Sequence, residues 1–206
     1  MFRDREDAAR QLAAKLGHLR GLNPLVLAIP RGAVPMGKIL AQALDGELDV
    51  VLVRKLGAPG QPELAVGSVD ESGWTYVAPH AASLGADEAW LDSEKREQLA
   101  TIRRRRSRYT PIRAPVSPTG RVVVVVDDGL ATGATMIAAL HAARHQKPAR
   151  LVCAVPVAAP ESLRQVRSLA DEVVCLHTPE FFQAVGQFYR HFPQVEDDEV
   201  ERLLKG

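Results

Sequence analysis

Five consecutive valines followed by two aspartates constrain this chain more than any other segment. The run covers Val122–Val126, and Asp127 and Asp128 come directly after it. β-Branched residues without polar alternation are typical of a strand buried on both faces of a parallel sheet. A loop containing Gly129 and Gly133 follows, and an apolar helical pattern begins after that loop. The segment therefore predicts a strand, a loop and the beginning of a helix, with two carboxylates where the strand ends.

This order of elements predicts an anion site. The first N–H groups of a helix have no partner within the helix, and the helix dipole favours negative charge there. Gly129 and Gly133 allow the backbone to approach a phosphate closely, and the hydroxyls of Thr132 and Thr135 add donors. The two preceding carboxylates would not attract a phosphate. We expect them to hold a sugar diol or a magnesium ion.

The segment resembles the phosphoribosyl pyrophosphate (PRPP) signature of the type I phosphoribosyltransferases. That signature has an apolar strand, two acidic residues, a spacer ending in Thr-Gly, and then a small residue and Thr or Ser. The resemblance implies that the acidic pair holds the ribose 2′- and 3′-hydroxyls, directly or through Mg²⁺. The PRPP-binding positions implied by this match are Asp127, Asp128, Gly129, Ala131, Thr132, Gly133, Ala134 and Thr135. Neither a P-loop nor a dinucleotide fingerprint is present.

The rest of the chain alternates between apolar runs and helical patterns. Strands are predicted at residues 25–29, 49–53, 121–126, 150–155 and 172–176, and helices at about 34–44, 134–145 and 161–169. This order predicts an α/β fold with three layers, in which helices cover both faces of a parallel sheet of the phosphoribosyltransferase type. We expect one domain over residues 1–206, with its core at about 20–56 and 120–176. The remaining parts are an insertion between the second and third core strands, at about 57–119, and a small C-terminal hood at about 177–206.

The insertion is the segment whose structure is hardest to predict. Residues 54–80 read as irregular, although residues 64–69 and 74–77 could pair as a hairpin. A long charged helix is expected from Ala86 to Arg106, and a proline-containing connector at 109–120. The family has a mobile loop that closes over its site, and the resemblance places that loop in this insertion. The four arginines at 103–106 are interpreted as a solvated face, with phosphate capture or nucleic-acid contact as alternatives.

Two further strand ends are candidates for the diphosphate of PRPP, because ligands of parallel sheets bind at the carboxyl ends of strands. Arg31 and Gly32 follow the first predicted strand, where family members carry a pyrophosphate loop with a non-proline cis peptide. Lys55 follows the second predicted strand, near the position where the resemblance places a diphosphate-binding lysine. The candidate catalytic residues are Arg31, Lys55, Asp127 and Asp128. The candidate metal ligands for Mg²⁺ are Asp127 and Asp128.

Composition narrows the choice of partners. The net charge of +1 provides no field that would attract nucleic acid, so a nucleic-acid partner is not expected. No apolar run approaches the length of a membrane span, and the charged N-terminus does not resemble a signal peptide, so we expect a cytoplasmic protein without a membrane partner. Cys153 and Cys175 lie in apolar runs and are interpreted as core residues. A homodimer is expected from the resemblance.

The resemblance implies an enzyme that transfers ribose 5-phosphate from PRPP to a nitrogenous aromatic base and releases pyrophosphate. Many members acting on 6-oxopurines have aspartate where this chain has Ala131, which disfavours hypoxanthine or guanine as the acceptor. Phe181, Phe182, Phe188 and Tyr189 are interpreted as hood packing or as stacking surfaces for the acceptor. A PRPP-sensing regulatory protein on the same fold is the alternative, and chemistry on another phosphorylated sugar is a third possibility.

Overall fold

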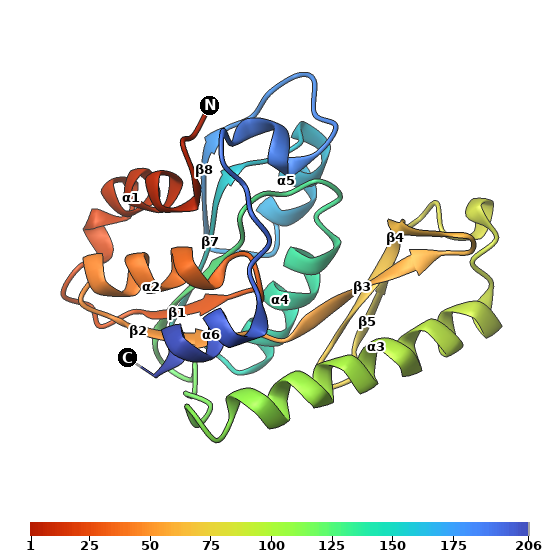
Figure 1. The fold of residues 1–206 in the computed structure, drawn as a ribbon, viewed down its shortest axis with the longest axis horizontal. Helices are drawn as coiled ribbons and strands as arrows, with labels where there is room; N and C mark the ends of the chain where they lie inside the picture. Colours follow the sequence, from red (N-terminus) through yellow and green to blue (C-terminus); the bar gives the residue numbers. More distant parts are fainter. Residues whose placement is uncertain (206) are drawn as a thin grey trace.

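A five-stranded parallel sheet forms the centre of the molecule, described here for residues 1–205 of a computed structural model (Figure 1). The strand order is β2-β1-β6-β7-β8, and every neighbouring pair is parallel. The strands are β1 (Leu25–Ala28), β2 (Glu47–Val50), β6 (Val122–Val126), β7 (Arg150–Val157) and β8 (Glu172–His177). The prediction of a five-stranded parallel core is confirmed. The second strand ends at Val50, three residues before the predicted end at Val53.

Helices cover both faces of this sheet, which confirms the three-layer α/β fold. The helices of the core are α1 (Arg5–Lys15), α2 (Val34–Ala43), α4 (Ala134–His145) and α5 (Pro160–Arg167). The side chains of Val124 and Val126 pack in the same apolar cluster as those of α1 and α2. Val123 and Val125 belong to the opposite cluster, together with α4 and α5. The valine run is buried on both faces because successive side chains of a strand point to opposite sides.

The insertion is a second, antiparallel sheet with a long helix beside it. Its elements are β3 (Val53–Ala58), β4 (Gln61–Asp70), β5 (Thr75–Val77) and α3 (Glu88–Tyr109), and the sheet order is β3-β4-β5. Together they project from one side of the core in Figure 1. The hairpin of β4 and β5 is confirmed, with Ser68 opposite Tyr76. The description of residues 54–80 as irregular was wrong, because β3 pairs with β4 along most of its length.

The hood packs against the first residues of the chain. Within the described residues, the regular elements of the hood are the 3-10 helix η3 (Val185–Phe188) and the α-helix α6 (Asp197–Leu204). Two other short 3-10 helices, η1 (Gly17–Leu19) and η2 (Ala82–Leu84), lie outside the hood. The backbone N–H of Phe2 donates to the carbonyl of Phe188 at 2.8 Å, and the N–H of Arg190 donates to the carbonyl of Phe2 at 2.9 Å. The N-terminus thereby brings α1 next to the hood and the carboxyl ends of the core strands.

None of the helices within residues 1–205 has the length and apolar character needed to cross a membrane.

Candidate active site

The acidic pair lies at the carboxyl end of β6 and is enclosed by other polar groups. The pair accepts hydrogen bonds from a backbone amide and from a guanidinium group. Asp127 Oδ1 accepts from the N–H of Asp128 at 2.9 Å. Asp128 Oδ2 accepts from Arg5 Nε at 3.0 Å and from Arg5 Nη2 at 2.9 Å. Arg5 lies 123 residues away in the sequence, on α1. No local pattern in the sequence indicates Arg5 as a partner of Asp128, because the two residues are far apart in the chain.

Burial makes the acidic pair costly to ionise. The pKa of Asp127 lies well above its ordinary value because burial and the neighbouring charge of Asp128 both disfavour the carboxylate. Burial also raises the pKa of Asp128, and Arg5 opposes this shift through its charge and hydrogen bonds. A bound cation, or hydroxyl groups that donate to the carboxylates, would relieve this cost. The pair therefore suits a diol or a metal ion, as the sequence predicted.

The number and type of side chains around the acidic pair decide whether they could hold Mg²⁺. Among residues 1–205, no group of three or more His, Cys, Asp or Glu side chains is arranged to hold a metal ion. Mg²⁺ in phosphate-processing sites uses one or two carboxylates and takes its remaining ligands from water and substrate oxygens. Asp127 and Asp128 fit that partial role, since they supply two carboxylates and no more.

The predicted phosphate loop connects β6 to α4. Gly133 precedes the helix with φ at +76°, a left-handed conformation that favours glycine. Thr132 Oγ1 accepts a hydrogen bond from the N–H of Ala134 at 3.4 Å, and Ser162 Oγ donates to the carbonyl of Ala131. The N–H groups of the first turn of α4 remain directed at the loop, as at any helix N-terminus. This geometry suits a phosphate at the position the sequence predicted.

Two contacts around this loop were not foreseen. Ser68 on β4 is fully buried and donates to the carbonyl of Ala134 at 2.6 Å, so the insertion holds the beginning of α4. Gly129 lies against Val185 of the hood. A Cβ at position 129 would lie only 2.7 Å from Val185 Cγ1. The absence of a side chain at Gly129 therefore allows the hood to approach β6.

Arg31 and Gly32 lie beside the acidic pair, as predicted. The peptide bond between Pro30 and Arg31 is cis, which agrees with the feature that the family resemblance implies for this loop. A cavity of about 410 Å³ connects this loop with Asp128. Its lining residues are Arg5, Pro30, Arg31, Gly32, Arg54, Arg105, Asp128, Phe192, Pro193, Gln194 and Val195.

Lys55 does not line this cavity. Its ammonium group lies 2.6 Å from Glu63 Oε2, on the neighbouring strand β4. Successive residues of a strand point to opposite sides, and it is the preceding residue, Arg54, that reaches the cavity. The structure therefore brings Arg31 and Gly32 together with Asp128, but it directs Lys55 elsewhere.

The arginine run of α3 divides among several environments. Arg105 lines the cavity, and its side chain is only 14% exposed. Arg106 pairs with Glu71 at 2.7 Å, whereas Arg104 is exposed and donates to Thr101 Oγ1 at 2.9 Å. A single interpretation of residues 103–106 as a solvated face was therefore wrong for Arg105 and Arg106, whose side chains are mostly buried. A helix turns by about 100° per residue, so neighbouring arginines cannot share one environment.

The aromatic residues of the hood mainly pack against one another. The ring centroids of Phe182 and Phe188 lie 5.1 Å apart, and the ring of His177 meets Phe188 edge-on at 5.8 Å. Tyr189 stacks on Phe192 and its hydroxyl donates to the carbonyl of Asp128 at 2.7 Å. Phe181 is 85% exposed. The packing interpretation holds for Phe182, Phe188 and Tyr189, whereas the ring of Phe181 is exposed to solvent.

Substitution of Gly32 by alanine is expected to destabilise the protein by about 1 to 3 kcal/mol. A Cβ at this position would lie 2.3 Å from Asp128 Oδ2 and 3.2 Å from Arg5 Nη2, so the ion pair would have to move. Gly17→Ala is the matched control, because nothing lies within 4 Å of a Cβ there. Urea denaturation of both variants checks this. Equal stabilities would show that the loop after β1 can shift away from Asp128.

The fold and site together define a class of protein: a parallel α/β protein with an acidic pair and a glycine loop before a helix at the carboxyl edge of its sheet. The family follows from comparison with known proteins. The family model of the phosphoribosyl transferase domain matches residues 2–192. The chain therefore belongs to the phosphoribosyl transferase domain family, a family of transferase enzymes.

Individual relatives agree with this family. A Mycobacterium tuberculosis protein assigned to the phosphoribosyl transferases is 45% identical over 205 residues, which make up 99% of this chain and 46% of that protein. The chain thus spans about half the length of this relative. An adenine phosphoribosyltransferase of Rhodospirillum centenum is 34% identical over 116 residues, or 52% of this chain and 64% of that protein. The crystal structure of a Thermus thermophilus protein, TT1426, is 47% identical and superimposes with a TM-score of 0.82, covering 99% of this chain and 97% of that chain.

Proposed function

We propose that this chain transfers ribose 5-phosphate from PRPP to a ring nitrogen of an aromatic base and releases pyrophosphate. One observation carries the proposal: a single cavity of about 410 Å³ joins the Arg31–Gly32 loop to Asp128, and the glycine loop that leads into α4 follows Asp128 directly in the chain. The three groups of PRPP, namely its diphosphate, its ribose and its 5′-phosphate, would then each have a distinct set of partners.

The roles of the residues follow from the chemistry of the reaction. The bond from ribose C1 to the diphosphate oxygen breaks, the bond from C1 to the base nitrogen forms, and the proton of that nitrogen passes to water. Arg31 would stabilise the negative charge that develops on the departing diphosphate. Asp127 and Asp128 would accept hydrogen bonds from the ribose hydroxyls and keep C1 in position. The loop from Thr132 to Thr135 would hold the 5′-phosphate and supply binding energy remote from the reacting bond.

Mg²⁺ is the cofactor that this chemistry implies. When bound, it would neutralise the negative charge of the leaving group. Asp127 and Asp128 are the residues that would hold it, because burial disfavours both carboxylates and Arg5 pairs with Asp128 alone.

The acceptor is proposed to be an aromatic base other than a 6-oxopurine. Ala131 stands where many family members acting on 6-oxopurines have an aspartate that hydrogen-bonds the base. The similarity to an adenine phosphoribosyltransferase over about half of the chain supports the same choice. The acceptor would lie under the hood, near the exposed ring of Phe181.

Calorimetry with PRPP and Mg²⁺, followed by an assay of pyrophosphate release, tests the proposal. The native protein is expected to bind PRPP, and Asp127→Asn is expected to lose most of this affinity while staying folded. A panel of purine and pyrimidine bases should then reveal base-dependent release of pyrophosphate. Binding without release for any base would favour a PRPP-sensing regulator instead. Failure of the native protein to bind PRPP would overturn both functions.

The proposed partners and location follow the family. We expect a homodimer, a cytoplasmic location and no nucleic-acid partner, the last because the net charge is only +1. Analytical ultracentrifugation at micromolar concentration checks the dimer, and a monomeric species throughout would exclude it.

A further inference from the structure

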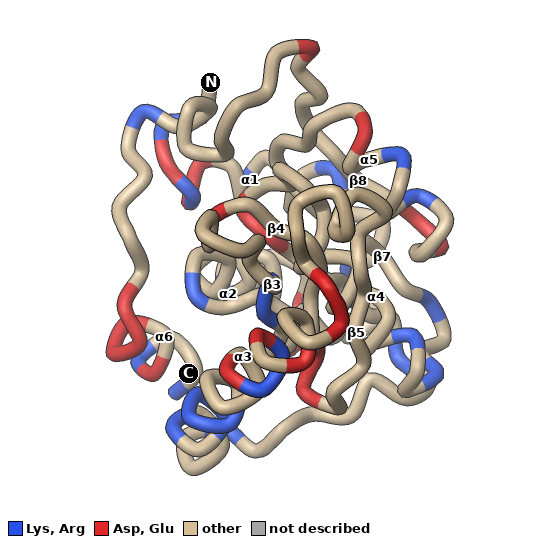
Figure 2. The backbone as a smooth tube through the Cα atoms, turned by 90° about the vertical axis from the view of Figure 1, so that its right-hand side faces the viewer, with Lys and Arg blue, Asp and Glu red and all other residues tan. Residues whose placement is uncertain are grey.

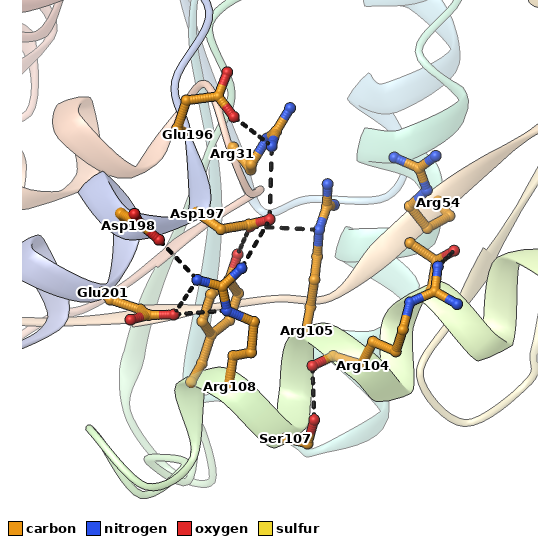
Figure 3. Close-up of polar contacts among 12 residues, drawn as sticks. Arg31, Arg54, Arg104, Arg105, Ser107, Arg108, Glu196, Asp197, Asp198 and Glu201 are labelled. Atoms are coloured by element: carbon orange, nitrogen blue, oxygen red, sulfur yellow. Dashed lines mark hydrogen bonds and ion pairs between the residues drawn. The ribbon is translucent and has the colours of Figure 1, made fainter.

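Three arginines from separate elements converge on the cavity beside the acidic pair (Figure 3). Arg31 comes from the loop after β1, Arg54 from β3 and Arg105 from α3. All three line the cavity, and the side chains of Arg31 and Arg105 are only 23% and 14% exposed. Guanidinium groups this close repel one another unless anions lie among them.

The carboxylates nearby do not balance these three charges. Among residues 1–205, Arg54 has no carboxylate within 4.0 Å, and its Nε donates to the neutral Gln98 at 2.9 Å. Burial, followed by the charges of Arg105 and Arg31, lowers the pKa of Arg54, and the more distant carboxylates of Glu94 and Glu63 oppose this shift only in part. The cavity therefore holds an excess of positive charge on its wall, which favours an anionic ligand.

One carboxylate is shared between the other two arginines. Asp197, in the first turn of α6, lies 3.6 Å from Arg31 Nη1 and 3.8 Å from Arg105 Nε. These contacts are longer than the distance of about 2.8 Å that a charge-assisted hydrogen bond prefers. The basic end of α3 lies beside the acidic beginning of α6 in Figure 2. Arg31 also reaches Glu196 at 3.1 Å, but that carboxylate is 64% exposed.

If Asp197 moves away from Arg31 and Arg105, its third arginine partner still has other carboxylates nearby. Its third arginine partner, Arg108, lies 3.6 Å from Asp197 but much closer to Asp198, at 2.9 Å, and to Glu201, at 2.6 Å. The hydroxyl of Tyr109 donates to Asp197 Oδ1 at 2.6 Å, so α6 remains attached to α3 through that contact. The contacts of Asp197 with the two cavity arginines are thus long, whereas its hydrogen bond from Tyr109 is short.

We propose that Arg54 and Arg105 bind the diphosphate of the substrate together with Arg31, and that Asp197 is an internal counterion which the diphosphate displaces. The inference rests on the proposed function, because the cavity is contiguous with Gly32 and Asp128. Guanidinium groups match phosphate oxygens in pairs of hydrogen bonds, and three of them surround the free space. Two of the three belong to the insertion, which gives this part of the chain a role in the reaction.

The insertion holds these two arginines in place. Gln98 on α3 contacts Arg54, and Trp90 Nε1 on α3 donates to the carbonyl of Gly57 on β3 at 3.0 Å. The buried hydrogen bond from Ser68 then connects this sheet to α4. The cations are therefore supplied by a packed sheet and helix, so little ordering is needed when an anion binds.

Calorimetry with inorganic pyrophosphate and, separately, with ribose 5-phosphate tests this inference. Arg105→Met is expected to weaken pyrophosphate binding at least tenfold, as two hydrogen bonds to a charged group are lost. Its affinity for ribose 5-phosphate should stay unchanged. Arg104→Met is the matched control, because this neighbour on α3 is exposed and does not line the cavity, and it should change pyrophosphate affinity less than twofold.

Asp197→Asn provides the opposite test. Loss of the competing charge is expected to tighten pyrophosphate binding severalfold, a gain that misfolding cannot imitate. Unchanged pyrophosphate affinity in Arg105→Met, or weaker affinity in Asp197→Asn, would overturn the inference. If the native protein binds neither ribose 5-phosphate nor pyrophosphate, the proposed function fails first. Ribose 5-phosphate binding without any pyrophosphate binding would refute the arginine site alone.

Discussion

Replacing Arg5 with methionine is expected to lower the free energy of unfolding by about 3 kcal/mol at neutral pH, because it leaves a buried carboxylate without its partner. The side chains of Arg5 and Asp128 are only 11% and 16% exposed, so water cannot compensate for the lost guanidinium. The substitution also removes a hydrogen bond of 2.6 Å to the carbonyl of Pro193 and a contact of 3.8 Å with the ring of Phe192. Methionine keeps most of the length of the side chain, so the loss reports mainly on the charge.

The pH dependence of this effect separates the ion pair from packing. Burial raises the pKa of Asp128 and Arg5 opposes the shift, so removing Arg5 raises the pKa of this carboxyl further. The penalty is present while Asp128 is ionised in the folded state and disappears as falling pH protonates it. Urea denaturation between pH 4 and pH 8 measures this. A penalty that stays constant over this range would mean that packing dominates.

A residue on the same helix provides the control. Arg10 pairs with Glu6, but their side chains are 63% and 55% exposed. Arg10→Met should therefore change stability by less than about 1 kcal/mol, as is usual for exposed ion pairs. If Arg5→Met and Arg10→Met lowered the free energy of unfolding equally, the charge of Arg5 would not stabilise the ionised Asp128.

Replacing Asp127 with asparagine is expected to weaken PRPP binding and to stabilise the folded protein. Asparagine Oδ1 can still accept from the N–H of Asp128, which Asp127 accepts at 2.9 Å. It carries no charge for ribose hydroxyls or Mg²⁺, so the affinity should fall by about 2 kcal/mol, or roughly 30-fold. The same neutral side chain removes a buried charge beside Asp128, which should raise stability by about 2 kcal/mol, or roughly 4 to 8 °C in Tm.

The gain in stability should depend on pH in one direction. In the native protein the pKa of Asp127 lies well above its ordinary value of 3.8. Ionisation of Asp127 therefore costs stability as the pH rises from about 4 through the raised pKa, whereas the protonated form costs little at lower pH. The advantage of Asp127→Asn should be large at pH 7 and small at pH 4. Thermal denaturation at both pH values checks it, and an advantage that grows toward acid would contradict this explanation.

The segment around the valine run could be predicted almost completely from the sequence. The strand was expected at residues 121–126 and lies at Val122–Val126, and the following helix was expected at about 134–145 and lies at Ala134–His145. Each signal here is local: β-branched residues, two glycines and helical spacing occur within one stretch of chain. The cavity likewise unites Arg31, Gly32 and Asp128, because parallel strands end at one edge of the sheet.

The strand β3 could not be predicted in the same way. Gly57, Pro59, Gly60 and Pro62 all lie near it, and such residues usually mark a loop. In the structure, Gly60 has φ at +69° and allows a tight turn between β3 and β4, and the register shifts on either side of Gly57. Pairing with β4 and packing against α3 outweigh the weak local preference of this segment.

The sequence by itself determined the parallel α/β core, the position of the acidic pair and the glycine loop that leads into α4. These features depend on residues adjacent in the chain, whose side-chain type and spacing decide their conformation. Only the tertiary structure decided which charges meet. Arg5 reaches Asp128 across 123 residues, Arg54 rather than Lys55 lines the cavity, and Asp197 approaches Arg105 from the other end of the chain. Electrostatic partners are set by distance in space and by burial, and neither of these quantities is encoded in any local pattern.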